Sequence, residues 1–229
     1  MNRPSTSTHA PGRIAAAAAI LLGFCLFATV AAVNVPYEAG DAELLSWWQD
    51  GSNTAAGLIS MAFAVLTAVL LSVLGNHLVL LAGDRSPRLA AFARSMVGAF
   101  TATMLVAASL RGVIGHLTDV QGDPLPGIDV LRYTTALNYA VLGVAGMGSL
   151  ALAVLALGAL VLRTGVLARW AGLVSLACGA VVLLAVVALA GSLAVPVAIL
   201  WAWSTGVAVL RAPVVVTTND REQIDAMTP

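Results

Sequence analysis

Three histidines are the side chains of this sequence that most often bind metals, and their positions keep them apart. His9 lies in a polar N-terminal segment, whereas His77 and His116 lie near opposite ends of two consecutive apolar segments. A haem in a membrane protein needs its axial ligands at one depth, and structural zinc needs closely spaced cysteines and histidines. The spacing meets neither requirement, so we expect no metal, haem or other cofactor.

Catalytic groups are separated in a similar way. Proteolysis within a membrane requires a nucleophile with its base, or two carboxylates, at matched depth. The apolar segments contain no Asp or Glu, and Ser109 lies nearly two helical turns from His116. Cys25 and Cys178 sit in apolar runs, which is typical of small buried side chains. We therefore expect no enzymatic activity, and the missing carboxylate also counts against proton- or sodium-coupled transport.

A polar cluster is predicted where the third apolar segment meets the loop that follows it. An unpaired guanidinium costs at least about 2.5–3.5 kcal/mol near mid-membrane and less toward its edge. We therefore expect Arg111 to pair with Asp119 or Asp129; binding of an anionic headgroup or solute is the alternative. The candidate outer-face cluster consists of Arg111, His116, Asp119, Asp129 and Arg132.

A second candidate position is Asn138, within the fourth apolar segment. An amide is not fully satisfied within its own helix and usually bonds to a neighbouring one, so we expect Asn138 to act as an interhelical clamp. Ser175 and Gly179 stand one helical turn apart and predict close helix packing. Such positions build a bundle and do not indicate an activity.

The elements that must carry these residues cross a membrane. The chain has 229 residues, of which 60% are hydrophobic and only 10% charged, and its mean hydropathy is +0.95. A soluble domain carries about 25% charged residues, so this composition excludes a soluble globular protein. All 11 basic residues are arginines, and 11 acidic residues balance them. The zero net charge argues against nucleic acid as a partner.

The gaps between charged residues predict six crossings. A helix rises 1.5 Å per residue, so a hydrocarbon core of about 30 Å needs about 20 apolar residues. The long uncharged stretch between Arg169 and Arg211 holds two crossings with a turn near Gly191–Ser192, and each other gap holds one. The fold class is therefore all-α, a polytopic bundle of six transmembrane helices within residues 13–211. The predicted spans are about residues 14–33, 55–75, 91–113, 135–159, 170–190 and 193–211.

The distribution of arginines predicts the orientation. With six crossings, both tails and the second and fourth loops share one side of the membrane, and that side holds nine of the eleven arginines. The other side holds seven of the eleven acidic residues. The positive-inside rule then places both termini in the cytoplasm, with the bundle in the plasma membrane. A cleaved signal peptide ending at Val30–Ala32 is the alternative for the first segment, but its apolar stretch exceeds the usual 7–15 residues.

The segments outside the spans are short. We expect residues 1–12 to form a disordered cytoplasmic tail and residues 212–229 to form a second cytoplasmic tail. Residues 41–50 combine acids with leucines and two tryptophans at helical spacing. This pattern predicts a short helix that lies in the membrane interface and anchors the second crossing. The alternative is a lid over an outward-facing cavity.

The C-terminal third carries a resemblance to a known group of proteins. The stretch Arg163–Gly172, the two apolar segments after it, and the segment from Leu200–Trp201 to Leu210–Arg211 resemble a pattern in small six-helix integral membrane proteins of high-GC Gram-positive bacteria. These proteins form domains of unknown function. This sequence has Ala168 where that pattern usually has Pro. The resemblance implies a membrane fold and transfers no catalytic residue.

Two classes of function remain open. The first is a non-enzymatic membrane component, a scaffold or partner subunit, which contacts the lipid bilayer and either a membrane protein partner or further copies of itself. The second is a small permease or channel-like carrier for a small solute or lipid, built from two three-helix halves of opposite orientation. A continuous polar face on two or more helices would favour the carrier, and a dry interior would favour the scaffold.

Overall fold

The computed structural model describes residues 10–36 and 40–212, and within these ranges every regular element is helical. Six of its helical segments are long and apolar enough to cross a membrane, which confirms the predicted all-α, six-span fold class. The six segments are α1 (Ala10–Ala31), α3 (Gly51–Ala82), α4 (Pro87–Gly115), α5 and α6 (together Ile128–Thr164), α7 (Arg169–Val187) and α8 (Val195–Leu210).

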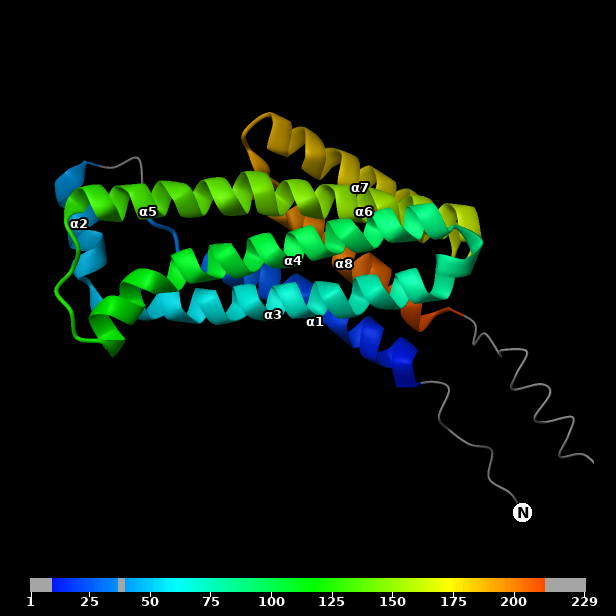
Figure 1. Cartoon of the computed structure of the whole chain (residues 1–229), viewed down its shortest axis with the longest axis horizontal. Coiled ribbons are helices and arrows are strands. Elements are labelled where there is room, and N and C mark those ends of the chain that lie inside the picture. Colours follow the sequence, from blue (N-terminus) through cyan, green and yellow to red (C-terminus); the bar gives the residue numbers. More distant parts are fainter. Residues whose placement is uncertain (1–9, 37–39, 213–229) are drawn as a thin grey trace, which may run out of the picture.

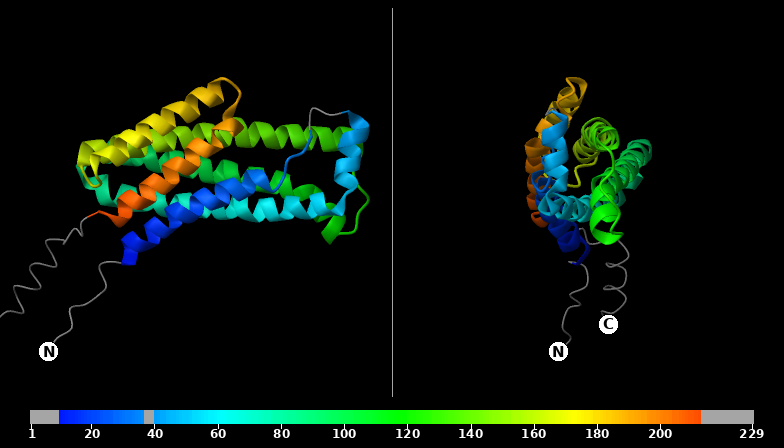
Figure 2. Two further views of the ribbon diagram at one scale, coloured as in Figure 1. Left: turned by 180° about the vertical axis from the view of Figure 1, so that it is seen from behind. Right: turned by 90° about the vertical axis from the view of Figure 1, so that its left-hand side faces the viewer.

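The long helices run side by side along one axis, and α2 (Asp41–Gln49) crosses one end of them (Figures 1 and 2). We call this the α2 end, and the opposite end, where α1 begins, the Ala10 end. Helix α4 packs between α3 and α6, while α1 packs against both α3 and α8. Helices α7 and α8 form a hairpin against α6 and α1. The long axis of this bundle is therefore the direction in which the chain crosses the bilayer.

The boundaries differ from the predicted spans mainly at the helix ends. Residues 10–12 were expected in the first tail but belong to α1, since a proline such as Pro11 is tolerated in the first turn of a helix. The predicted helix at 41–50 is confirmed as α2. The remaining parts of both predicted tails, residues 1–9 and 213–229, and the acidic Glu38 lie outside the described residues.

The six segments differ greatly in length. Helix α3 has 32 residues and α5–α6 together have 37, which at 1.5 Å per residue gives about 48 and 55 Å. Helices α7 and α8 are much shorter, and the turn between them packs against the middle of the long helix, where a Cβ on Gly191 would collide with the carbonyl of Gly143. A slab of about 30 Å that holds this hairpin leaves the α2 end outside the hydrocarbon core. The helices that contain the predicted spans 55–75 and 135–159 therefore continue beyond those spans at both ends.

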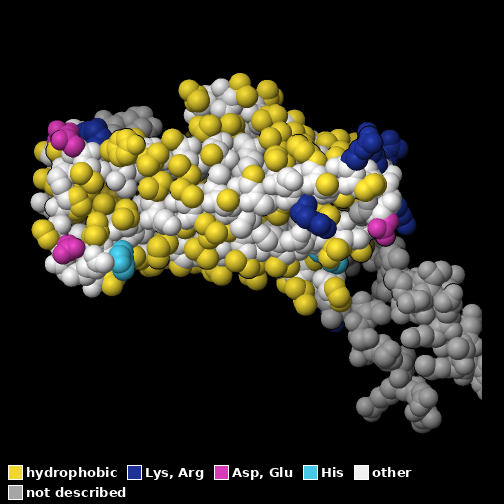
Figure 3. Space-filling model, in the orientation of Figure 1, with side chains coloured by type: hydrophobic (Ala, Val, Ile, Leu, Met, Phe, Trp, Pro, Cys, Tyr) yellow, Lys and Arg dark blue, Asp and Glu magenta, His cyan; other side chains and the backbone are white. Residues whose placement is uncertain are grey.

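Two apolar clusters hold the bundle together. The larger one extends through all the long helices and includes Phe100, Met104 and Trp201, each at most 1% exposed. The smaller one lies at the α2 end, where Leu44 and Trp48 of α2 pack onto neighbouring helices. On the face shown in Figure 3, apolar side chains are spread along the bundle, and the charged side chains lie mainly toward its two ends. This is the pattern expected of a bundle surrounded by lipid.

Two short π-helical turns interrupt the regular helices, one at the α2 end and one near the middle of the long α5–α6 helix. One, His116–Val120, continues α4, and the other, Val141–Gly146, joins α5 (Ile128–Ala140) to α6 (Met147–Thr164). A π-turn inserts one extra residue and changes which side chains face inward, and such turns are frequent near functional sites. Both turns lie within five residues of a polar side chain singled out from the sequence, Arg111 and Asn138 respectively.

Candidate functional site

Arg111 is buried inside the bundle, where it joins three helices. Its side chain extends from α4 and is only 5% exposed. The Nη1 atom donates hydrogen bonds to the carbonyl of Thr29 on α1 at 2.5 Å and to the hydroxyl of Ser60 on α3 at 2.7 Å. The Ser60 hydroxyl in turn donates to the same Thr29 carbonyl at 2.7 Å. The guanidinium therefore ties α4 to α1 and α3.

The position of Thr29 explains why its carbonyl accepts two hydrogen bonds. Thr29 lies two residues before the end of α1, and the last four carbonyls of a helix have no N–H partner within it. These carbonyls also carry the partial negative charge of the helix dipole, which stabilises a cation placed there. The hydroxyl of Thr29 is engaged separately, since it donates to the carbonyl of Cys25 at 2.7 Å. Arg111 thus caps the C-terminus of α1.

Glycines bring α3 and α4 close together around Arg111. A Cβ on Gly57 would lie 3.0 Å from the carbonyl oxygen of Arg111, and one on Gly115 would lie 2.6 Å from the carbonyl oxygen of Thr54. Real Cβ atoms essentially never approach another atom as closely as 2.6 Å, and 3.0 Å is tighter than most real Cβ contacts. The two helices can therefore approach this closely only because these positions lack side chains, and the approach sets Ser60 within reach of the guanidinium.

The predicted ion pair of Arg111 with Asp119 or Asp129 is wrong. The hydroxyl of Thr118 donates to Asp119 at 3.0 Å, and Asp129 is exposed in the first turn of α5. Neither carboxylate is paired with Arg111, whose charged group instead enters the bundle. A guanidinium presents five N–H donors. Carbonyl and hydroxyl oxygens can meet the geometry of these donors as well as a carboxylate can.

The other members of the predicted outer-face cluster remain on the surface. Arg132 of α5 forms an ion pair with Asp41 of α2 at 2.6 Å, and both side chains are well exposed. His116 is exposed, with its Nε2 3.4 Å from the amide nitrogen of Gln121. The structure therefore places these groups near one end of the bundle but does not bring the five predicted residues into one site.

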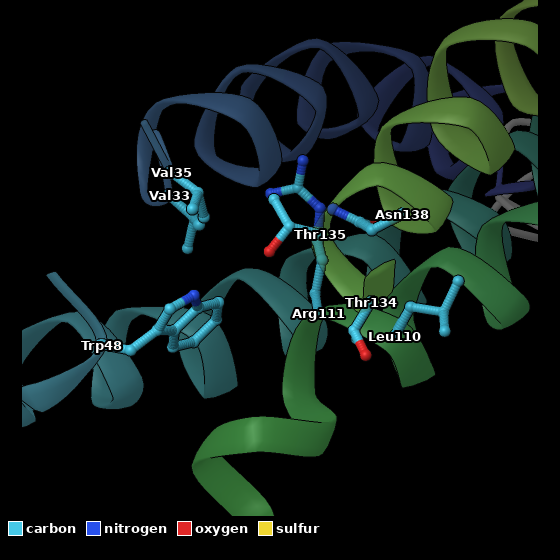
Figure 4. A pocket seen from close by; sticks show the side chains of 8 residues that line it. All are labelled: Val33, Val35, Trp48, Leu110, Arg111, Thr134, Thr135 and Asn138. Atoms are coloured by element: carbon cyan, nitrogen blue, oxygen red, sulfur yellow. The ribbon is translucent and has the colours of Figure 1, made fainter. Parts of the chain in front are cut away.

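A small cavity lies next to Arg111, beneath α2 (Figure 4). The space open to water-sized molecules is about 20 Å³. One buried water needs about 10–15 Å³ by the same measure, so the cavity can hold one water or one ion of similar size. It is too small for an organic cofactor. The lining side chains come from α2, α4, α5 and the segment after α1: Val33, Val35, Trp48, Leu110, Arg111, Thr134, Thr135 and Asn138.

Four buried polar atoms around this cavity make no hydrogen bond within the described part of the chain. They are Trp48 Nε1, Arg111 Nε, Thr135 Oγ1 and Asn138 Oδ1, and each belongs to a side chain at most 7% exposed. Leaving such a group unpaired costs about 1–3 kcal/mol, and native proteins rarely keep several together. Figure 4 shows these side chains facing one another. Their concentration marks this cavity as the candidate functional site.

The role expected of Asn138 needs correction. It is buried on α5, as an interhelical clamp would be, but its carbonyl oxygen bonds to no described residue. The amide lines the cavity beside Arg111. An amide opposite a cavity can meet a small bound species, and this alternative was not visible from its sequence context.

Helix α2 covers the cavity. Trp48 is 6% exposed and packs with Val33, Val35 and Leu131 of the smaller apolar cluster, while Trp47 meets it edge to face with ring centroids 4.8 Å apart. The indole of Trp48 thus points into the protein and not toward lipid headgroups. This position corresponds to the lid that the sequence left as the alternative to an interfacial anchor.

Sequence reasoning missed Thr29, Ser60, Trp48 and Thr135 as neighbours of Arg111. A signal existed for part of this arrangement, because Gly57 and Ser60 on one helix and Gly112 and Gly115 on the next are small residues at helical spacing. Opposite an arginine, such a pair of small-residue faces predicts close approach. The Thr29 carbonyl had no signal, since every residue carries one.

Comparison with known proteins leaves the function to be argued from the chain itself. No family model, no curated protein and no solved structure matches it. The arrangement of polar atoms around Arg111 is therefore the starting point for a functional assignment. The three histidines and two cysteines add nothing to it, because the described residues hold no group of three potential metal ligands.

Proposed function

We propose that the protein is a non-enzymatic component of a bacterial plasma membrane, a scaffold or a partner subunit of a membrane assembly. The observation that carries this proposal is the apolar interior of the bundle. Its polar side chains bond in separate pairs, such as the half-buried Ser72 with Thr101 at 2.8 Å and the buried Trp201 with Ser175 at 3.0 Å. Such isolated pairs join neighbouring helices, whereas a transport path needs polar groups in succession.

The cavity supports the non-enzymatic assignment. Its polar groups are a guanidinium, an amide, two threonine hydroxyls and an indole. These groups donate hydrogen bonds at neutral pH and include no general base and no activated nucleophile. The space of about 20 Å³ also excludes an organic substrate while α2 is in place. Binding, and not bond breaking, is the chemistry that suits such a lining.

The proposed orientation has both termini in the cytoplasm. It rests on the nine arginines assigned to the Ala10 side against two assigned to the α2 side. Single cysteines introduced at Ser5, Asp123 and Asn219 test it in a background lacking Cys25 and Cys178. A membrane-impermeant thiol reagent added to intact cells should label only the cysteine at 123. Labelling of the cysteines at 5 and 219 instead would show the opposite orientation, with α2 on the cytoplasmic side.

Membership in the group of six-helix proteins from high-GC Gram-positive bacteria is part of the same proposal. It is supported by the sequence pattern from Arg163 to Arg211, which covers α7, α8 and the turns beside them. Because those proteins are themselves uncharacterised, the grouping suggests a bacterial origin and a membrane location but no activity.

A small carrier is the second candidate, and the polar cavity beside Arg111 is the observation that favours it. A transported solute would enter from the α2 end after α2 moves away. It would then have to pass the apolar layer that contains Phe100, Met104 and Leu71, all at most 1% exposed. These side chains are apolar, and the neighbouring hydroxyls of Ser72 and Thr101 are already bonded to each other, so a polar solute would lose its hydrogen bonds to water in that layer. The scaffold is therefore the better supported function.

Two measurements on the full-length protein distinguish these functions. The purified protein in liposomes should give no flux of chloride, potassium or small organic solutes above that of empty liposomes. In native membranes dissolved with a mild detergent, it should migrate as an assembly larger than one chain. Saturable flux that Trp48→Ala abolishes and Trp47→Ala preserves would establish the carrier instead. A single chain without flux would contradict both functions.

A further inference from the structure

The described residues balance the charge of Arg111 only in part. Among the described residues its hydrogen-bond acceptors are the Thr29 carbonyl and the Ser60 hydroxyl, and no carboxylate forms an ion pair with it. The C-terminus of α1 supplies roughly half an elementary negative charge, less than the full positive charge of the guanidinium. A buried charge in this condition attracts a counter-ion, because few water dipoles are near enough to stabilise it.

The atoms around the cavity are arranged to bind an acceptor. The Nε–H of Arg111, the Nε1–H of Trp48 and the hydroxyl of Thr135 belong to three different helices, line the same cavity and have no partner in the described chain. The amide of Asn138 is the fourth group. Its oxygen and nitrogen exchange places by a half-turn of the side chain, so it can present an N–H as well. An anion here would accept three or four hydrogen bonds.

A water molecule is the natural competitor for this position. Water could accept from Arg111 and Trp48 and donate to Thr135 and Asn138, which would satisfy all four atoms. It would leave the charge of the guanidinium unchanged. Since the electrostatic interaction between unit charges strengthens several-fold where water is excluded, charge and not hydrogen-bond count decides between the two occupants.

The size and walls of the cavity restrict the anion. A space of about 20 Å³ suits a single atom or water-sized species, and sulfate, phosphate or the phosphate of a lipid would require α2 to move. The opposite walls are formed by Val33, Val35 and Leu110. Apolar walls favour an anion that loses its hydration readily. We propose that this cavity is a binding site for one halide-sized monovalent anion, with chloride as its physiological form.

Such an anion would hold the α2 end together. It would bond at once to α2, through Trp48, and to α4 and α5, through Arg111 and Thr135. Binding would therefore stabilise the folded protein in proportion to anion concentration. At ten times the dissociation constant, the ratio of folded to unfolded protein rises about tenfold. This inference is independent of the proposed scaffold function, because a structural anion is compatible with a scaffold and with a carrier.

Thermal unfolding of the purified full-length protein in detergent tests the site. The protein is first exchanged into sodium gluconate, because the gluconate anion is too large for the cavity. It is then titrated with sodium chloride or sodium bromide at constant ionic strength. We expect a saturable rise in Tm with either halide and no rise with sodium sulfate, sodium phosphate or added anionic lipid. Bound bromide should also quench part of the tryptophan fluorescence, because Trp48 lines the site.

Matched variants separate a specific site from a general salt effect. Arg111→Gln should abolish the halide-dependent rise, while Arg132→Gln, an exposed arginine at the same end, should retain it. Trp48→Phe and Thr135→Val should weaken halide binding at least tenfold and keep the test valid where Arg111→Gln does not fold. Trp47→Phe is the control for Trp48→Phe.

Three results would overturn the proposal. Equal Tm shifts in all the variants would show a general salt effect, and a rise with phosphate or lipid alone would show a different anion. A wild-type Tm that does not change with halide concentration would show that water occupies the site. If the Tm of the Glu38→Gln variant did rise with halide, the carboxylate of Glu38 would be the counter-charge of Arg111 in the wild type.

Discussion

Two buried tryptophans show how differently the two ends of the bundle are built. Trp201 of α8 is 1% exposed, and its indole N–H donates to the hydroxyl of Ser175 at 3.0 Å. That hydroxyl donates in turn to the carbonyl of Ala171 at 2.8 Å. Trp48 of α2 is 6% exposed, and its indole N–H has no partner among the described residues. The same donor is thus fully satisfied in the α6–α7–α8 region and unsatisfied at the α2 end.

The contrast extends to the helices around each tryptophan. Gly158 and Gly172 allow α6 and α7 to pack backbone against backbone, and Ser175 fits into the same contact. At the α2 end, glycines again allow a close approach, but the polar atoms beside it surround a cavity. Closely packed, satisfied groups serve stability, whereas unsatisfied buried groups are retained where something must bind. The comparison therefore assigns stability mainly to one region and binding to the other.

The largest expected effect comes from filling the α6–α7 contact. A Cβ at position 158 would lie 2.8 Å from the Cβ of Ser175 and 3.0 Å from the carbonyl of Gly172. We expect Gly158→Val to destabilise the protein by about 3 kcal/mol, because overpacked backbone contacts cannot relax. The control is Gly98→Val, where a Cβ meets nothing within 4 Å. Reversible unfolding in mixed micelles with increasing SDS measures both, and equal losses would remove the distinction between a packed and an open helix face.

The next effect compares the two tryptophans directly. Trp201→Phe should cost about 2 kcal/mol, since it removes a buried hydrogen bond and leaves space in a packed core. Trp48→Phe, measured in halide-free buffer, should cost less than about 1 kcal/mol, because the lost N–H has no partner in the chain. The same SDS unfolding assay applies to both variants. A larger loss for Trp48→Phe than for Trp201→Phe would mean that the α2 end also contributes strongly to stability.

A smaller effect tests which groups interact with Arg111. We expect a coupling energy of about 1 kcal/mol between Arg111→Gln and Ser60→Ala, because the two side chains are bonded at 2.7 Å. Arg111→Gln and Asp129→Asn should be additive within about 0.5 kcal/mol. Double-mutant cycles from unfolding in micelles measure both values. Strong coupling of Arg111 to Asp129, with none to Ser60, would instead support the ion pair between Arg111 and a loop carboxylate that the sequence suggested.

The smallest effect concerns pH at the start of α3. Hydrogen bonding to the side chain of Ser52, together with the bond that its backbone N–H donates to the Asp50 carboxylate at 2.9 Å, lowers the pKa of Asp50. A lowered pKa contributes stability above the unfolded value of about 3.9, and this contribution is lost as pH falls through the folded pKa. Asp50→Ala should therefore flatten the decline in Tm between pH 5 and 3 slightly. Asp123→Ala is the control, and an equal change there would assign the decline to other acids.

Much of the fold could be predicted from local patterns. Six apolar stretches separated by charges gave six helices, and the acids, leucines and tryptophans of residues 41–50 gave α2. The turn near Gly191–Ser192 was also predicted, because glycine and proline interrupt an uncharged stretch too long for one helix. The helices α3 and α5–α6 are longer than the spans predicted within them, because about 20 residues suffice to cross the hydrocarbon core and a helix can continue beyond it.

The candidate site could be predicted only in part. Arg111 and Asn138 were recognised, because a charge or an amide in an apolar segment demands a partner. The partners expected for Arg111 were carboxylates in nearby loops or an external anion, and neither the Thr29 carbonyl nor the Ser60 hydroxyl was among them. Trp48 was interpreted mainly as an interfacial anchor, for which its sequence context is typical. A tryptophan beside acids has the same pattern whether its ring faces lipid or protein.

The sequence by itself determined the crossings of this protein, because transfer into lipid depends on each segment's own hydropathy and hydrogen bonding within a helix is local. Only the tertiary structure decided where Arg111 finds its partners. The Thr29 carbonyl is 82 residues away in sequence and the Ser60 hydroxyl 51, and both become accessible only where α1 ends and glycines bring α3 against α4. A backbone carbonyl leaves no trace in the amino-acid sequence. The cavity under α2 therefore exists only in the assembled bundle.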